Sequence, residues 1–435
     1  MIRFKFESVI HLFLASAAIG VAISYSRLYL FHIVLILMAV LFLSSKENGF
    51  KFKIQRLPTR MHHVFYAMFI WYFISIVWSI SRLYAAVYLF YIFCGVAVVT
   101  TMIYYATDLE KQRRVFKVLS LVFIVEIIIS LLEGAGVMRW PISPFSPYVA
   151  YFGRDMSQLD PGLSEDVLAS VLSMPTGFQW SPNNLAVTMV IVTPFFLFHK
   201  SKLVKYSGVL SALVIVAMAS SRGNFIALSF MMILYLFFFS KKRAILSLFL
   251  IVPVLLNSHL LDKAKASENG KVREIAYSFD ALKTYISFED LDASSIGIRT
   301  QLMRNGISAL KDTYGLGVGG GGSRAVQEEM GGVAGKITSM HNFWIEMLVD
   351  SGVVFTCVFV VWYITLLLAN YRIYLSNTNE ELTRYSGAVS LSLAGFSVGA
   401  VSASSVIYLL PMWLLFGFAV ATINNYRRMR AVGNQ

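Results

Sequence analysis

Apolar residues dominate the chain in long runs that are separated by short charged or turn-forming stretches. A helix needs about 20 mainly apolar residues to cross the hydrocarbon core of a bilayer. Runs of this kind recur along the whole sequence and predict an all-α, polytopic helical membrane protein with about twelve transmembrane helices. The predicted spans lie near residues 8–25, 28–43, 62–80, 84–105, 115–132, 183–198, 206–220, 224–239, 244–260, 343–369, 385–402 and 404–425.

Composition agrees with this pattern. Hydrophobic residues make up 57% of the 435 residues and charged residues only 14%, whereas soluble domains contain about 25% charged residues. These proportions exclude a soluble enzyme and a disordered chain. The net charge of +13 would indicate a nucleic-acid partner in a soluble protein. Basic residues also set the orientation of membrane proteins, so we expect contacts with membrane lipids and no nucleic-acid partner.

The connections between the predicted spans are alternately rich and poor in basic residues. They gather in the N-terminal tail, in every second connection and in the C-terminal tail. The short connections between these contain single arginines, namely Arg27, Arg82 and Arg222. Because cytoplasmic loops carry an excess of Lys and Arg, this alternation predicts that both termini are cytoplasmic.

Two outer connections are much longer than the others. The first, at about 133–182, is rich in proline, and the second, at about 259–342, is large enough to fold as a small subdomain. We therefore expect residues 1–258 to hold helices 1–9 and residues 343–435 to hold helices 10–12 with a basic tail. Long loops in compact proteins are usually functional, so candidate chemistry is sought on the outer side.

Two outer residues are the first candidates for chemistry. His341 stands where the large loop re-enters the membrane, and it fits either a general base or a polar residue that caps the next span. Arg222 stands in a tight turn between two apolar runs. Its guanidinium group fits either a bidentate phosphate ligand or a side chain that reaches the lipid headgroups.

The large loop contains two further features of interest. Residues 296–311 have the pattern of an amphipathic helix that carries Arg299 and Arg304. A glycine-rich segment, 315–322, follows at once. Glycine permits close approach of a backbone to a ligand, and a flexible linker is the alternative interpretation.

Acidic residues give no clear metal site. Asp290-Leu291-Asp292 is a D-x-D pattern, but on the outer side nucleotide sugars are absent, so we interpret it as incidental. No cluster of Cys and His has metal-ligand spacing, and we expect no metal or other cofactor. Glu126, Glu346 and Asp350 fall inside predicted spans, where they fit either a proton or ion path or interior hydrogen bonds.

The order of these motifs resembles the O-antigen ligase and O-antigen/exopolysaccharide polymerase (Wzy-type) superfamily. Segments 175–178 and 181–186 resemble polymerase-like members in particular, with Ser181-Pro182 where many relatives have Asn-Pro and Tyr314 where they have proline. The resemblance rests on Ser221-Arg222-Gly223, on Arg299 about twenty residues before Gly315-x-Gly317-x-Gly319, and on His341-Asn342 followed by Glu346, Asp350 and Gly352.

The resemblance implies a metal-independent glycosyltransferase of the bacterial cytoplasmic (inner) membrane, whose site faces the exterior and whose donor is a glycan on undecaprenyl diphosphate. His341 would deprotonate the acceptor hydroxyl, with inversion at the anomeric carbon, and Arg222 and Arg299 would bind the diphosphate. Supporting or glycan-binding roles would fall to Asn342, Gly317, Gly319, Arg304, Arg324 and Asn183.

The segment at 175–186 favours a polymerase that joins the repeat units of an O-antigen, capsule or exopolysaccharide. The same chemistry fits an O-antigen ligase, which transfers the glycan to lipid A-core. A flippase or transporter of lipid-linked oligosaccharides is the alternative from another class. The implied partners are the lipid-linked oligosaccharide, an acceptor glycan or lipid A-core, a chain-length regulator and a flippase.

Overall fold

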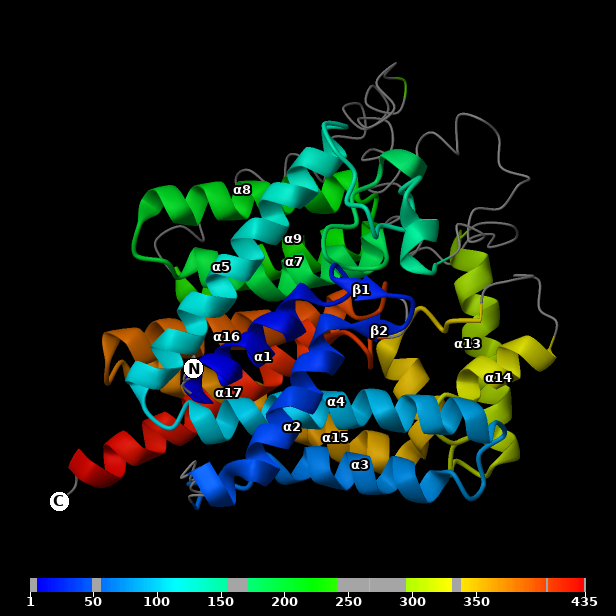
Figure 1. Ribbon diagram of the computed structural model, residues 1–435, viewed down its shortest axis with the longest axis horizontal. Helices are drawn as coiled ribbons and strands as arrows, with labels where there is room; N and C mark the ends of the chain where they lie inside the picture. Colours follow the sequence, from blue (N-terminus) through cyan, green and yellow to red (C-terminus); the bar gives the residue numbers. More distant parts are fainter. Residues whose placement is uncertain are drawn as a thin grey trace.

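Long helices that lie side by side make up almost all of the described chain. The computed structural model describes residues 6–48, 56–154, 171–240, 266, 295–330, 338–403 and 406–433. The described strands, β1 (Ser24–Tyr25) and β2 (Leu28–Tyr29), form one short antiparallel hairpin. Most helices run along a common direction, and the two termini lie at the same end of the bundle (Figure 1). The other end holds the hairpin together with α13 (Ser295–Asp312) and α14 (Gly322–Glu329).

Each predicted apolar segment that the structure describes contains a helix, but residues 20–25 and 28–29, which lie within two predicted spans, form a turn and the β-hairpin instead. Segment 244–260 and most of the large loop before residue 295 lie outside the described residues. A short 3-10 turn, η1, spans Val149–Phe152. The helices are α1 (Phe6–Ile19), α2 (Leu30–Asn48), α3 (His63–Ser75), α4 (Arg82–Tyr105), α5 (Leu109–Gly134), α7 (Pro182–Leu197), α8 (Lys202–Met218), α9 (Arg222–Leu234) with its π-helical extension η2 (Tyr235–Phe239), α15 (Phe343–Ser376), α16 (Glu380–Gly399) and α17 (Leu410–Gly433).

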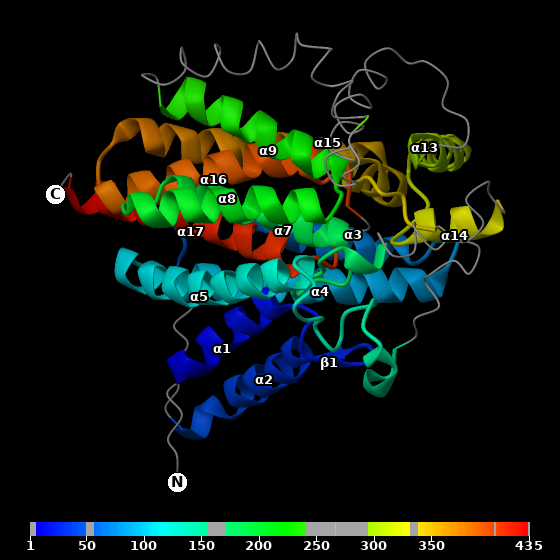
Figure 2. The same cartoon turned by 90° about the horizontal axis from the view of Figure 1, so that it is seen from above.

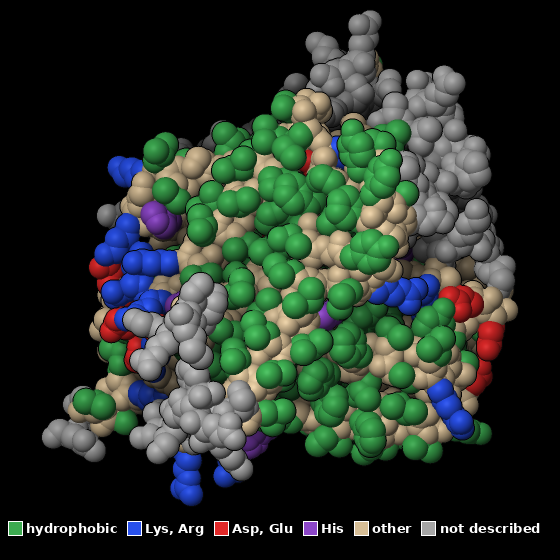
Figure 3. Space-filling view, in the orientation of Figure 1, with side chains coloured by type: hydrophobic (Ala, Val, Ile, Leu, Met, Phe, Trp, Pro, Cys, Tyr) green, Lys and Arg blue, Asp and Glu red, His purple; other side chains and the backbone are tan. Residues whose placement is uncertain are grey.

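An apolar belt crosses the middle of the bundle on the face shown in Figure 3. In the face shown in Figure 3, hydrophobic side chains cover the centre, Lys and Arg gather at the end with the termini, and Asp and Glu also appear at the opposite end. Large side chains in this belt are strongly exposed, among them Leu83, Leu121, Val354 and Val361. Soluble proteins rarely expose so much contiguous apolar surface. Within the described ranges, four helices, α4, α5, α9 with η2, and α15, are long and apolar enough to cross a bilayer. A helical membrane protein is thus confirmed, and the expected number of spans stays a prediction.

Helix α17 lies at the centre of the packing. It runs between α16 on one side and α4 on the other (Figures 1 and 2). Its Trp413 and Phe416 are almost fully buried. Trp413 packs directly on Gly95 of α4, where a Cβ atom would lie 2.1 Å from the indole ring. The absence of a side chain at Gly95 therefore allows these two helices to approach closely.

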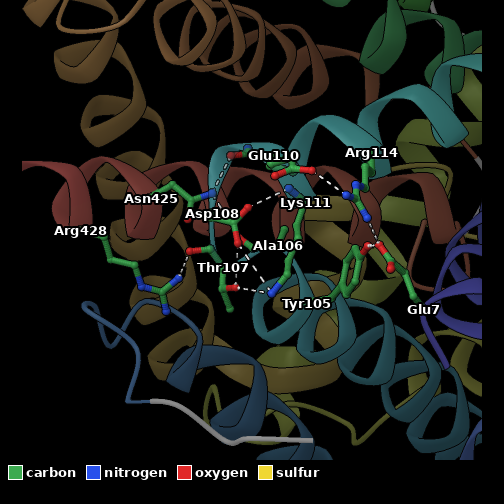
Figure 4. Close-up of polar contacts among 11 residues, drawn as sticks. Glu7, Tyr105, Ala106, Thr107, Asp108, Glu110, Lys111, Arg114, Asn425 and Arg428 are labelled. Atoms are coloured by element: carbon green, nitrogen blue, oxygen red, sulfur yellow. Dashed lines mark hydrogen bonds and ion pairs between the residues drawn. The ribbon is translucent and has the colours of Figure 1, made fainter. Parts of the chain in front are cut away.

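Charged side chains at the end with the termini are tied to their neighbours (Figure 4). Asp108 caps α5 by accepting a hydrogen bond from the Lys111 amide at 2.9 Å. Arg114 donates to Glu7 of α1 at 2.7 Å and to Glu110 at 2.5 Å. The turn between α4 and α5 also accepts hydrogen bonds from α17, where an asparagine and an arginine donate to its carbonyl groups. These contacts join α1, α5 and α17 at this end.

Candidate active site

The turn that carries Arg222 is fixed by a small polar cluster. Ser221 donates to Asn183 at 2.8 Å, and its hydroxyl lies 3.3 Å from that of Ser402. Asn224 donates to the Ser221 hydroxyl at 2.8 Å. Ser221, Asn224 and Ser402 are buried, whereas the Arg222 side chain is exposed. The cluster therefore holds the base of α9 in place and leaves the guanidinium group accessible.

Close packing explains the glycine in this Ser-Arg-Gly turn. A Cβ atom on Gly223 would lie 2.5 Å from Cβ of Ser402, a distance that real Cβ contacts do not reach. The neighbouring segment begins α7 in an equally defined way, because Ser181 caps the helix and Pro182 occupies its first turn. Serine is as good an N-cap as asparagine, so the Ser-Pro departure from the family pattern preserves the local structure.

His341 has an unusual backbone conformation. Its φ of +47° is left-handed, which is uncommon for residues other than glycine and is found preferentially at functional sites. The residues that follow fix this conformation. Phe343 donates its amide to the carbonyl of Ala400 at 3.0 Å, and the Trp344 indole donates to the carbonyl of Ser397 at 2.9 Å.

The segment after α16 therefore supports both candidate residues. Ser402 packs against the turn of Arg222, and Ala400 binds the backbone two residues beyond His341. The structure thus places Arg222 and His341, which are far apart in sequence, on two segments that share one neighbour. Sequence order alone could not reveal this neighbour.

The imidazole of His341 is held in its neutral form. Burial lowers its pKa from 6.5 to about 4, and the positive charge of Arg299 contributes to the decrease. Within the described part of the chain, its buried Nδ1 atom has no hydrogen-bond partner. A neutral imidazole is the form that a general base requires, and Arg299 on α13 lies close enough to influence it.

Helix α13 confirms the predicted amphipathic helix. Leu302 and Leu310 are buried, and the helix contacts α14 and α15. Arg299 is half-buried near His341, whereas Arg304 is exposed. The two arginines of this helix thus differ in their surroundings, and only Arg299 is seen to act on the histidine.

The glycine-rich segment is packed within the protein. Val318 donates to the carbonyl of Val349 at 2.9 Å, and Gly319 donates to that of Asp350 at 3.1 Å. A Cβ atom on Gly317 would lie 2.5 Å from the Gly352 amide nitrogen, and one on Gly319 would lie 2.5 Å from Cβ of Ser79. Protein atoms therefore fill the space that a side chain would need at these two glycines, and the segment is not a free linker.

A kink in α15 makes room for this segment. Gly352 has φ +80° and ψ 173°, which interrupts the helix. A Cβ atom there would lie 2.3 Å from the carbonyl oxygen of Leu316. Tyr314, where relatives have proline, has a φ of +51°, and proline could not adopt this value because its ring fixes φ near −65°.

The three acids inside predicted spans all accept hydrogen bonds. Asp350 accepts from the amides of Gly321 and Ser323, at 2.9 and 2.8 Å, and so holds the start of α14. Glu346 accepts from the Tyr88 hydroxyl at 3.0 Å. Glu126 accepts from the Gln179 side chain at 2.9 Å. Of the two interpretations of these acids, the interior hydrogen bonds are the one observed.

Two of the expected supporting residues are engaged in other contacts. The Asn342 oxygen caps α15 by accepting from the amides of Trp344 and Ile345, at 3.1 and 3.3 Å. Asn342, and not His341, is therefore the cap of this helix. Arg324 pairs with Glu328 at 3.4 Å and lies 4.9 Å from the ring centre of Tyr84.

A second arginine site escaped the sequence analysis. Arg154 stacks on Trp180, 4.2 Å from the ring centre, and donates to the Ser26 carbonyl at 3.0 Å and the Ser24 hydroxyl at 2.9 Å. Burial lowers the pKa of Arg154. It joins the first outer loop to the β-hairpin. Its only signal in the sequence is an arginine in a Pro-rich loop, which does not identify its partners.

Metal ligands were not expected in this region. Among the described residues no group of three His, Cys, Asp or Glu is arranged to hold a metal ion. Asp290 and Asp292 of the D-x-D pattern lie outside the described residues.

The fold and these residues define a polytopic helical membrane protein with a neutral, half-buried histidine beside Arg299 at one end of its bundle. Residues 207–360, which contain Arg222, Arg299 and His341, match the family model described as O-Antigen ligase. The chain is also similar to the teichuronic acid biosynthesis protein TuaE of Bacillus subtilis (strain 168), with 26% identity over 153 residues.

The similarity to TuaE covers 35% of this chain and 31% of the relative, so the chain spans about a third of the curated relative's length. Together the two matches confirm the resemblance to the O-antigen ligase and polymerase superfamily. They support a role of ligase or polymerase type in polysaccharide biosynthesis.

Proposed function

We propose that the protein is a glycosyltransferase that polymerises the repeat units of a surface polysaccharide. The donor is an oligosaccharide on undecaprenyl diphosphate, and the acceptor is a sugar hydroxyl of another unit. The protein lies in the bacterial cytoplasmic membrane with both termini in the cytoplasm and His341 on the outer side. The observation that carries this proposal is the neutral, half-buried imidazole of His341 beside Arg299, within the segment that matches the family model.

The reaction needs a base and a stabilised leaving group. In the proposed step, His341 removes the proton of the acceptor hydroxyl while the hydroxyl oxygen bonds to the anomeric carbon. The bond from this carbon to the phosphate oxygen breaks, and the lipid diphosphate leaves with the electron pair. Attack from the opposite face inverts the anomeric centre. Arg222 and Arg299 stabilise the departing negative charge, for which guanidinium groups are well suited.

Donor binding would also activate the base. Arg299 contributes to the low pKa of His341 because its positive charge disfavours the imidazolium form. A diphosphate bound to Arg299 would bring negative charge to the same place and raise this pKa. His341 would then become a stronger base when the donor is present. This ordering would limit deprotonation to the complex in which transfer is productive.

The expected supporting residues divide into those that position other groups and those that can contact a glycan. Asn183 holds the Arg222 turn through Ser221, and Asn342 fixes the start of α15 beside His341. We propose that both are positioning residues. Gly317 and Gly319 allow the loop to pack on α15 and Ser79. Arg304 and Arg324 are exposed on α13 and α14. Arg304 is available to a glycan, whereas Arg324 would have to leave its contacts with Glu328 and Tyr84 to bind one.

An O-antigen ligase is the second candidate, and the description of the matching family favours it. Deletion of the gene separates the two. If long chains disappear while single capped units persist, the protein is a polymerase. If every capped form disappears, it is a ligase. If the polysaccharide profile is unchanged, both functions are excluded. If lipid-linked units also fail to accumulate inside the cell, a flippase is excluded as well.

A further inference from the structure

A cavity of about 560 Å³ opens between α5, α7 and α16. It lies near Asn379, just beyond the last residue of α15, whereas His341 precedes the first. A helix of 34 residues is about 50 Å long. The cavity is therefore at the opposite end of the bundle from the candidate active site, at the end that holds both termini (Figure 1).

The cavity has an excess of positive charge. Four basic side chains and two acidic ones line it. Glu381 accepts from Arg113, with Nε to Oε1 at 2.8 Å, and Glu380 pairs with Lys200 at 2.9 Å. These pairs use both acids, so the remaining basic side chains of the lining, Lys117 and Arg384, leave a net positive charge in the cavity.

Arg384 has an unused hydrogen-bond donor in this cavity. Its Nε atom is buried and has no hydrogen-bond partner among the described residues. Buried donors normally have partners, and an unpartnered one costs free energy. The first turn of α16, capped by Asn379, also lines the cavity, and helix N-termini favour anions. An anionic group would satisfy both features.

An apolar cavity of about 340 Å³ continues from the basic one. The two share Phe116, Lys117, Phe195 and His199. The second cavity lies along α5, α7 and α17 within the apolar belt, and its lining includes Leu121 and Ile124, which are exposed on the lipid-facing side of α5. The combination of a basic chamber and an apolar groove matches a phosphate group with a hydrocarbon chain.

We propose that these joined cavities bind an anionic phospholipid. Its phosphate contacts Arg384 and Lys117, and one acyl chain lies in the groove along α5, α7 and α17. A free phosphate would use the basic chamber alone and would leave the apolar groove unexplained. The inference does not depend on the proposed catalytic chemistry, because no residue of the pair of cavities belongs to the candidate active site.

Native mass spectrometry of the full-length protein from detergent tests this site. Phosphatidylglycerol is titrated against phosphatidylcholine, and inorganic phosphate is added as a competitor. The unmodified protein should retain phosphatidylglycerol in preference to phosphatidylcholine. The double variant Lys117→Gln/Arg384→Gln should lose about tenfold in phosphatidylglycerol affinity, while Lys202→Gln, an exposed charge at the same end outside the cavity, should leave it unchanged.

A second variant keeps the test independent of charge. Ile124→Trp fills the groove, retains every basic side chain and should also weaken phosphatidylglycerol binding. The variant His341→Ala should bind the lipid normally, which separates this site from the proposed catalysis. Any of three results would overturn the proposal. These are equal binding of the two lipids by the unmodified protein, equal phosphatidylglycerol affinity of the double variant and Lys202→Gln, and full displacement of phosphatidylglycerol by inorganic phosphate.

Discussion

The two ends of the bundle use their charges differently. At the end with the termini, Arg114 is paired with Glu7 and Arg113 is paired with Glu381. At the other end, Arg324 pairs with Glu328, but the Arg222 side chain is exposed and Arg299 lies beside a neutral histidine. We expect the excess of basic residues to reflect orientation in the membrane, whereas Arg222 and Arg299 are our proposed ligands for an anionic substrate. Four predictions test this difference, and the largest effect comes first.

Removal of the proposed base should have the largest effect. His341→Ala should lower glycosyl transfer by about 100-fold or more, since general base catalysis contributes about 10²- to 10⁴-fold. The chain-length profile of the surface polysaccharide in complemented deletion cells measures this loss. His63→Ala, an exposed histidine at the other end of α3 from the site region, should be fully active. Normal long chains with His341→Ala would exclude the base assignment.

Replacement of the proposed diphosphate ligands should have a smaller effect. Arg222→Lys and Arg299→Lys keep the charge but lose bidentate geometry, so kcat/KM should fall by about 10-fold or more. Arg113→Lys, the matched change at the end with the termini, should alter it by less than about 2-fold because surface pairs contribute little. Steady-state kinetics with a synthetic lipid-linked donor measures all three. Equal effects at both ends would remove the contrast between them.

The packed glycine segment predicts a loss of stability. Gly319→Ala combines a φ of +86° with a Cβ atom 2.5 Å from Ser79, so it should cost about 1–3 kcal/mol. Gly136 has a similar φ of +73°, but nothing lies within 4 Å of its added Cβ. Gly136→Ala is therefore a control for backbone strain alone and should cost less. Thermal unfolding in detergent compares them, and equal losses would show that the close contact does not matter.

A change in the pH dependence of activity should be the smallest of the four effects. A base works in its deprotonated form, so activity should rise with pH through the pKa of His341, which burial and Arg299 keep below 6.5 in the free protein. Arg299→Gln removes one of these two causes. In the profile of kcat/KM against pH, the acidic limb should therefore move to higher pH. The pKa of His341 should stay below 6.5, because the effect of burial remains. An unchanged or lower limb in this variant would contradict the proximity of the two side chains.

The helices could be predicted from the sequence, but their contacts could not. Periodicity located α13 and the start of α15 because long apolar runs and amphipathic faces are local properties. The glycines at 315–322 predicted either close approach of the backbone to a ligand or a flexible linker, whereas in the structure Gly317 and Gly319 pack closely on Gly352 and Ser79. Such a partner depends on tertiary packing. In the same way, nothing local reveals that Ser402 and Ala400 join the segments of Arg222 and His341.

The most direct test is transfer by the purified protein in liposomes. The reaction would contain only an undecaprenyl-diphosphate oligosaccharide and a metal chelator, and the products would be separated by length. We predict that the unmodified protein forms products of two or more repeat units, and that His341→Ala binds the donor but forms none. Products of equal length and amount from both proteins would contradict the assignment of His341, and no product from the unmodified protein would contradict the proposed polymerase.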